Sequence, residues 1–241
     1  SATIFIAITL TGGYWASGLT NVVNVVIIYV GIFTALWGGV RGFGGVENIL
    51  KALPEGKAWF DPVEGIGSAI LAAWMAVMIT MACSTQAAVQ IALSARDERS
   101  ARNGFLLGAL LIFPAGFLCS LFGIMAASQF PGLPNPTLAL PTIAAHISPL
   151  IGGLFLAGLW AADVSTAVGL LMGSSTLLVQ DVLNHLPLRS ERADSGLLMS
   201  RFAVLFVSAC SFVLSLTVVG ILKTLTSGLA ITTSFTPLIL A

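Results

Sequence analysis

The sequence predicts an all-α fold, a polytopic bundle of transmembrane helices. Of its 241 residues, 57% are hydrophobic and only 8% are charged, whereas about a quarter of the residues of a soluble domain are charged. Several apolar runs reach the roughly 20 residues that a membrane-spanning helix needs. The charged residues gather in the linkers between these runs. We therefore expect an integral membrane protein with the lipid bilayer as its solvent.

The apolar runs form a single membrane domain that covers residues 1–241. The expected spans, in chain order, are 1–10 (partial), 19–40, 66–95, 104–128, 150–178, 201–222 and 227–241 (partial). Because apolar runs stand at both ends, we expect this sequence to be an internal piece of a longer protein. Thr11-Gly12-Gly13 is expected to interrupt the helix after the first run, since paired small residues punctuate regular structure.

The linkers between the spans differ in composition. The longest polar one covers 41–65, and its middle, 46–53, is expected to form a short interfacial helix. The linker 129–149 is rich in proline, and its residues 142–147 are expected to form one or two turns of a surface helix. Pro114 falls inside the span 104–128, where it removes one backbone hydrogen bond and is expected to kink the helix.

Arginines indicate how the chain is oriented in the membrane. They gather in the linkers 96–103 and 179–200, which are separated by two spans and so lie on the same face. Basic residues are enriched in cytoplasmic loops. We therefore expect both linkers to be cytoplasmic and the protein to lie in the plasma or bacterial inner membrane.

Composition and motifs exclude several classes of function. The net charge is zero, so the sequence lacks the basic character of a nucleic-acid-binding protein, and we expect no such partner. The three cysteines lie singly in apolar runs without metal-ligand spacing. No HExxH or GxSxG motif occurs, so we expect no enzyme.

Asp163 is the only acidic residue deep inside an expected span. Charged residues at such positions are costly and mark functional sites, although an aspartate can also serve packing through hydrogen bonds to neighbouring helices. Ser165 and Thr166 follow it, in a helix rich in glycine and alanine that allows close backbone approach. Their hydroxyls either bond back to helix carbonyls or join carbonyl oxygens as hard ligands for a sodium ion.

The segment Ala161-Ala162-Asp163-Val164-Ser165-Thr166, with Ser174-Ser175-Thr176 and Asp181 downstream, resembles the sodium:solute symporter family. Further stretches match motifs of that family in the same order. They are Thr11-Gly12-Gly13 with Ala16, Thr20-Asn21 and Asn24, then Thr85-Gln86 with Gln90, then Phe235-Thr236-Pro237. The resemblance covers nearly the whole chain.

The resemblance implies the inverted-repeat architecture of LeuT-type transporters, with substrate and ion sites near the middle of the membrane. It implies sodium-coupled symport of a small organic solute by alternating access, with sodium as the coupling ion, no other metal and no cofactor. Its sodium ligands would be the hydroxyls of Ser165 and Thr166 and the carbonyl of Ala162, completed by carbonyls from a broken helix outside this sequence. The span 66–95 would carry the contacts to the solute and its gate. The candidates there are Met78, Ala82, Thr85 and Gln86.

Two departures from the family pattern qualify these expectations. Asn21 stands where the family often has aspartate, and Asp163 stands where it has an apolar residue. Asp163 is therefore a candidate coupling residue, and a proton-coupled relative is one alternative function. A transporter-like membrane module of a sensor protein is another. Met81 and Ala82 replace expected aromatic residues, which disfavours a sugar and leaves organic anions, amino acids and vitamins open.

Overall fold

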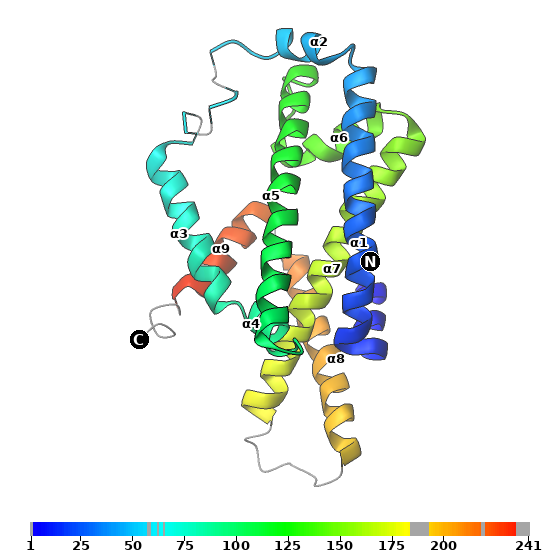
Figure 1. The fold of residues 1–241 in the computed structure, drawn as a ribbon, viewed down its shortest axis with the longest axis vertical. Helices are drawn as coiled ribbons and strands as arrows, with labels where there is room; N and C mark the ends of the chain where they lie inside the picture. The colour runs from blue at the N-terminus through cyan, green and yellow to red at the C-terminus, as the bar shows by residue number, and fades with distance from the viewer. Residues whose placement is uncertain are drawn as a thin grey trace. The chain divides into compact units, whose positions relative to one another are not determined.

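The computed structural model of the protein describes residues 2–56, 59–61, 63–64, 66–183, 193–217 and 220–234. All regular structure in this part of the chain is helical (Figure 1). The α-helices are α1 (Ala2–Gly42), α2 (Val46–Lys51), α3 (Ser68–Ser84), α4 (Gln86–Leu93), α5 (Glu98–Gln129), α6 (Ala139–His146), α7 (Pro149–Leu177), α8 (Ala193–Thr217) and α9 (Ile221–Ser234). A 3₁₀ turn at Pro136–Leu138 precedes α6, and a π-helical turn at Leu178–Val182 extends α7.

Four described stretches of helix are long and apolar enough to cross a membrane. They are Ser17–Gly42, Glu98–Gln129, Pro149–Val182 and Leu198–Thr217. The pair formed by α3 and α4 makes a fifth candidate if the two are counted as one bent span. The chain is therefore an all-α polytopic membrane protein, because in lipid a helix satisfies its own backbone hydrogen bonds.

One local expectation is met only in part. The helix α1 is assigned from Ala2 to Gly42, through Gly12 and Gly13, but the stretch of it that is long and apolar enough to cross a membrane begins at Ser17. Glycine is a weak helix former in water. In lipid, however, a backbone group without a hydrogen bond costs several kcal/mol, as does any amide that is buried without a partner. The helical hydrogen bonds therefore continue through both glycines.

The two short surface helices lie where the sequence places them. The helix α2 falls within 46–53, and α6 covers most of 142–147 but begins three residues earlier. The earlier start follows from the side chain of Asn135, whose oxygen accepts a hydrogen bond from the Thr137 amide at 3.0 Å and so starts the preceding turn. Pro114 lies within α5, which remains helical around it.

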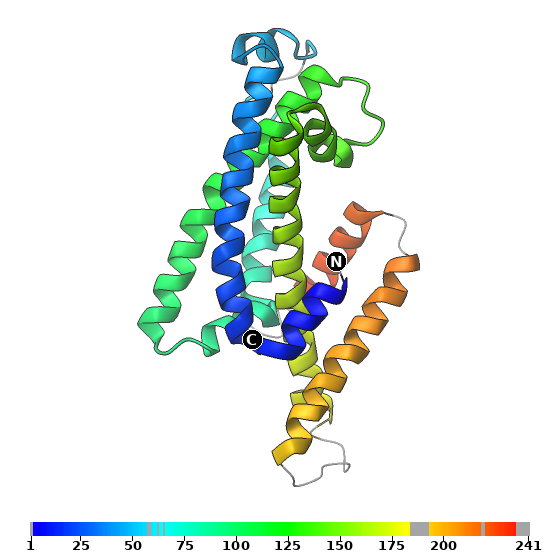
Figure 2. The ribbon, with the colours of Figure 1, turned by 90° about the vertical axis from the view of Figure 1, so that its right-hand side faces the viewer.

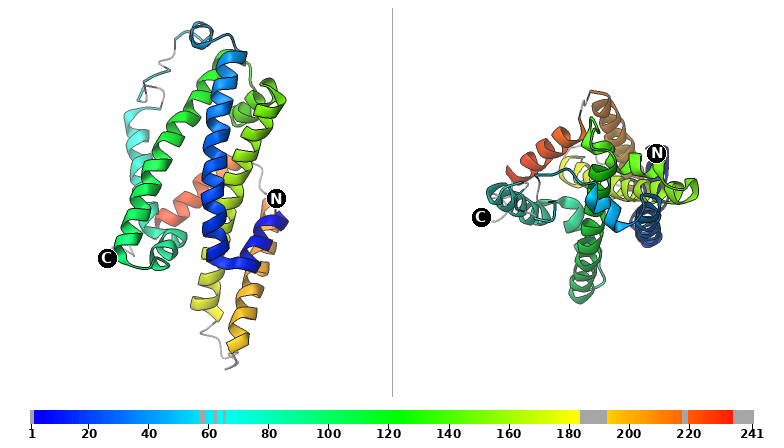
Figure 3. Two further views of the ribbon diagram at one scale, coloured as in Figure 1. Left: turned by 45° about the vertical axis from the view of Figure 1, so that its right-hand side comes forward. Right: turned by 90° about the horizontal axis from the view of Figure 1, so that it is seen from above.

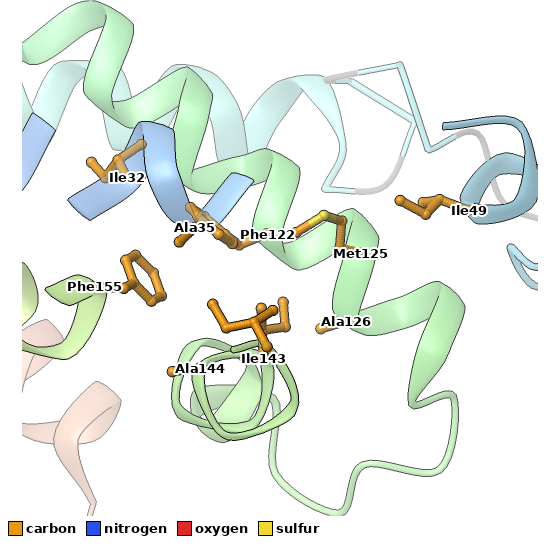
Figure 4. Close-up of a cluster of buried hydrophobic side chains, with 10 residues drawn as sticks. Ile32, Ala35, Ile49, Phe122, Met125, Ala126, Ile143, Ala144 and Phe155 are labelled. Carbon is orange, nitrogen blue, oxygen red and sulfur yellow. The ribbon is translucent and has the colours of Figure 1, made fainter. Parts of the chain in front are cut away.

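The chain divides into two compact units, each described here by itself. The first, termed the α5–α6 unit, comprises Thr20–Ile66 and Arg102–Asp163. Its core joins side chains from α1, α2, α5, α6 and α7 (Figure 4). The rings of Phe122 and Phe155 stack there with centroids 4.6 Å apart, and both side chains are buried. Ile143 of α6, also buried, completes the centre of this core.

Close contact between helix backbones holds α1 and α7 together within the α5–α6 unit, where Figure 2 shows them side by side. A Cβ atom on Gly158 would lie 3.3 Å from both the carbonyl oxygen of Ile27 and the Cα of Ile28. A Cβ on Gly31 would lie 3.1 Å from the carbonyl oxygen of Leu154. Glycine allows this close approach, because a Cβ atom at either position would lie closer to the other helix backbone than an ordinary van der Waals contact.

The second unit, termed the α3–α9 unit, comprises Ser1–Leu19, Gly67–Ala101 and Val164–Ala241. Within it α9 packs against α3, and Figure 3 shows the two helices side by side. The helix α8 packs against the π-helical turn at Leu178–Val182. A small cluster of buried side chains on α7 (Val164, Val168 and Met172) forms its own core.

Candidate functional site

The span expected over 66–95 is broken at Thr85. The helix α3 ends at Ser84 and α4 begins at Gln86, and the axes of Ser68–Ala82 and Gln86–Leu93 differ by 44°. Thr85 itself has extended backbone angles (φ −78°, ψ 114°). Its hydroxyl and its amide both donate to the carbonyl of Met81, at 2.7 and 2.9 Å. A break of this kind is tolerated at membrane depth where the backbone lines a cavity or is buried in protein.

A cavity of about 1000 Å³ opens at this break, within the α3–α9 unit. Its volume lies at the upper end of the range of roughly 300–1,000 Å³ that is usual for small-molecule sites. Six hydroxyl or amide side chains line it: Thr85, Gln86, Ser174, Ser211, Ser215 and Thr224. The other described lining residues are Met, Leu, Ala and Gly, and none is charged or aromatic. Such a lining, which carries no charge of its own, offers hydrogen bonds to a polar solute.

Gly173 brings α7 close to the first residues of α4 at the wall of this cavity. A Cβ on Gly173 would lie 3.4 Å from the amide nitrogen and 3.5 Å from the Cα of Ala87. The start of a helix carries amide groups without intrahelical partners, so the wall combines backbone polarity with the side-chain hydroxyls.

The four solute and gate candidates on this segment separate into two pairs. Thr85 and Gln86 line the cavity. Met78 and Ala82 lie on exposed positions of α3 and are not among the described lining residues. The structure therefore brings two of the four candidates together.

The sodium candidates all lie on α7, which is unbroken through them. Ala162 and Ser165 are half-buried, Thr166 is exposed, and each of the three interacts with another residue. A hydroxyl that donates to a carbonyl keeps lone pairs for a cation. Three oxygen donors within little more than one helical turn thus fit a hard cation such as sodium, which prefers oxygen ligands.

Thr166 also shares a face of α7 with the cavity. Leu170, Gly173, Ser174 and Leu177 follow it at intervals of three and four residues, and all four line the cavity. Ser165 lies about 100° away around the helix, as follows from 3.6 residues per turn. The hydroxyls of Ser165 and Thr166 therefore lie on neighbouring faces of α7.

Asp163 lies on an exposed position of α7, three residues before Thr166. No hydrogen bond or ion pair joins its carboxylate to any other described residue. A carboxylate in an apolar span faces a polar partner or a water-filled path in a working membrane protein. The packing interpretation of Asp163 thus gains no support from the described residues.

Sequence reasoning missed the contribution of α8 and α9 to the cavity. Ser211 and Ser215 are four residues apart on α8, and Thr224 lies on α9. The spacing of the two serines in an otherwise apolar helix is a signal, because residues four apart share one helix face. Thr224 has no hydroxyl residue four positions away, because residues 220 and 228 are both glycine.

A membrane bundle with a broken helix and a polar cavity is the arrangement that the resemblance to a transporter family leads us to expect. Comparison with known proteins agrees, since the sequence model of the sodium:solute symporter family matches residues 1–240. The chain belongs to the sodium:solute symporter family.

Curated relatives extend this finding. The sodium/pantothenate symporter of Haemophilus influenzae is 24% identical over 201 residues, which cover 81% of this chain and 41% of the relative. Sodium/glucose cotransporter 4 of Danio rerio is 25% identical, with 91% and 39% covered. Sodium/myo-inositol cotransporter 2 of Mus musculus is 24% identical, with 76% and 33% covered. The chain thus spans about two fifths of the length of the first of these relatives, and no solved structure matches it.

Proposed function

We propose that the protein is a secondary active transporter that couples the entry of a small organic solute to a sodium gradient by alternating access. The observation that carries this proposal is the cavity at the Thr85 break, which shares a face of α7 with Thr166. Relatives named as symporters, rather than as enzymes, support the coupled mechanism. An inverted-repeat arrangement of the full transporter is part of this proposal.

In this proposal α7 holds the coupling ion. The carbonyl of Ala162 and the hydroxyls of Ser165 and Thr166 act as hard oxygen ligands, and the bound sodium supplies the driving force. Gln86 and Thr85 bind the solute through their amide and hydroxyl groups. Because Thr85 links α3 to α4 and Gln86 begins α4, a change in the bend would move both groups relative to α3.

The solute is a small organic molecule. The relatives are named for pantothenate, glucose and myo-inositol, which differ in charge and shape. The described cavity lining holds hydroxyl and amide groups but no aromatic side chain. The lack of an aromatic side chain disfavours a sugar in the same way as Met81 and Ala82 do, and leaves organic anions, amino acids and vitamins open.

Sodium-dependent uptake by the full-length protein in proteoliposomes tests the proposal. Ser165→Ala and Thr166→Ala should each raise the sodium concentration for half-maximal uptake, whereas Gln86→Ala should raise the solute KM instead. Loss of a ligand or its support typically costs about 10–100-fold in affinity at metal sites. Ser120→Ala is the matched control, because that hydroxyl on α5 bonds only to the carbonyl of Phe117. Uptake that ignores the sodium gradient would contradict the proposal.

Asp163 supports a second candidate, coupling to protons. Its exposed carboxylate has no partner among the described residues and lies within one turn of the hydroxyl pair. A carboxylate that gains and loses a proton during the cycle would replace the sodium ion as the coupled charge.

A further inference from the structure

Asn24 is a buried polar side chain whose amide nitrogen has no hydrogen-bond partner in the described part of the chain. It lies on α1, and only 8% of its surface is exposed. Its amide nitrogen is fully covered and donates no hydrogen bond to any described residue. Buried side-chain polar groups are nearly always paired, so an unpaired one calls for an explanation.

The contact between α1 and α7 places Asn24 along the second helix. Gly158 of α7 meets Ile27 and Ile28, whereas Gly31 meets Leu154. Residue numbers thus rise along one helix as they fall along the other, so the two helices are antiparallel. One helical turn back along α1 from Ile28 reaches Asn24, and one turn forward along α7 from Gly158 reaches Ala161 or Ala162.

Asn24 therefore lies at the level of Ala161 and Ala162, within the α5–α6 unit that contains all three residues. Ala161 is itself buried, as expected of a residue on the packed face of α7. Ala162 is the residue whose carbonyl the proposed function assigns to sodium. An amide group without a partner is thus placed beside one end of the proposed ion site.

We propose that Asn24 is a further ligand of the coupling ion, through its side-chain carbonyl oxygen. This inference rests on the proposed function. An asparagine carries an oxygen acceptor and a nitrogen donor that exchange places when the amide turns by half a rotation. Amide carbonyl oxygens are hard ligands of the kind that alkali and alkaline-earth cations accept. The amide nitrogen of Asn24 makes no hydrogen bond to a described residue that would hold the amide in its present orientation.

The test measures ion binding without transport. The thermal unfolding of the purified full-length protein is followed at increasing NaCl, with choline chloride keeping the ionic strength constant. Asn24→Leu, which keeps the size of the side chain but removes both polar atoms, should raise the sodium concentration for half-maximal stabilisation by about tenfold, as loss of a supporting ligand does. Asn24→Asp keeps an oxygen and should retain sodium stabilisation.

Two further measurements separate a role in ion binding from a role in packing. The first is the sodium response of a control variant, and the second is the melting temperature of each variant in choline chloride alone, which reports a loss of packing. Thr34→Val on the same helix removes a hydroxyl that bonds only to α1 carbonyls, at 2.7 Å to Val30 and 3.2 Å to Gly31, and should leave the sodium response unchanged. If N24L does not fold, Asn24→Ala carries the same expectation. An unchanged sodium midpoint in a folded Asn24→Leu or Asn24→Ala protein overturns the inference alone. An unsubstituted protein that sodium does not stabilise overturns the proposed function as well.

Discussion

At the scale of single residues, the question is why Asp163, a charged residue, lies inside a membrane helix. It is the one charged residue of α7, and its surroundings along the helix are small or apolar. The cost of an ionised carboxylate at the centre of a membrane helix is several kcal/mol, about 2.5–3.5 on insertion scales. A charged residue at such a position usually has a function. The role of Asp163 can be tested directly in the full-length protein.

Asp163→Asn removes the charge and the proton site but keeps the size of the side chain. If the carboxylate attracts the cation or carries a proton, the variant should need more sodium for half-maximal uptake or should lose its dependence on pH. Uptake is measured over a grid of sodium concentrations and pH values in proteoliposomes. Identical sodium and pH profiles for the variant and the unsubstituted protein would remove Asp163 from the mechanism.

Asp97 makes a second prediction at this scale. Its carboxylate accepts a hydrogen bond from the amide of Ser100 at 2.7 Å and so caps the start of α5. Hydrogen bonds from the backbone and hydroxyl of Ser100 lower the pKa of Asp97 below its usual value of 3.8. The cap therefore stabilises α5 at all pH values above about 4 and is lost as the pH falls through the lower pKa of the folded protein.

Hydrogen exchange of the Ser100 and Ala101 amides checks this cap. Asp97→Ala should speed their exchange at neutral pH, because the N-terminal amides of α5 lose an acceptor. Asp97→Asn keeps an acceptor that does not titrate. Its protection factors, which are corrected for the intrinsic pH dependence of exchange, should therefore stay constant in the acidic range where those of the unsubstituted protein fall. Equal protection in Asp97→Ala would show that the hydrogen bond does not stabilise the helix start.

At the scale of helices, the close contact of α1 with α7 depends on glycine. Leu in place of Gly158 would have to enter a space bounded by the backbone of Ile27 and Ile28. Gly158→Leu should therefore lower the free energy of unfolding by about 1–3 kcal/mol, the usual cost of overpacking. Gly153→Leu is the matched control on the same helix, because no atom lies within 4 Å of its Cβ position. Equal melting temperatures for the two variants would contradict the close contact.

The helices also show what the sequence can and cannot predict. Apolar runs predicted the long helices and the polar linkers predicted α2 and α6, because hydropathy follows directly from contact with lipid or water. The break at Thr85 left no such trace, since residues 81–90 contain neither Gly nor Pro. Thr85 and Gln86 entered the candidate site only through the family resemblance.

The cavity shows the same division between local and tertiary information. Ser174 belongs to a motif that the sequence displays, and Thr85 and Gln86 to another. The serines of α8 and Thr224 of α9 join them only through packing within the α3–α9 unit. The sequence order of the two compact units is interleaved, and hydropathy cannot predict which spans pair, because every span is apolar.

At the scale of the whole molecule, the membrane topology is the property that all other proposals require. A linker on each side of α5 offers a direct test, since one lies within 96–103 and the other within 129–149. We propose that the first is cytoplasmic, as its arginines indicate, and that the second faces the outside. Both linkers present exposed positions, Arg99 before most of α5 and Gly132 after it.

Arg99→Cys and Gly132→Cys, each in a full-length protein whose native cysteines are replaced by serine, place one thiol at each end of α5. Because a helix of 32 residues is about 48 Å long at 1.5 Å per residue, α5 exceeds the thickness of the hydrocarbon core and its ends should lie on opposite faces. A membrane-impermeant maleimide should label Gly132→Cys in right-side-out vesicles and Arg99→Cys only in inside-out vesicles. Labelling of both thiols from one side would mean that α5 does not cross the bilayer, and the reverse pattern would invert the proposed orientation of the chain in the membrane.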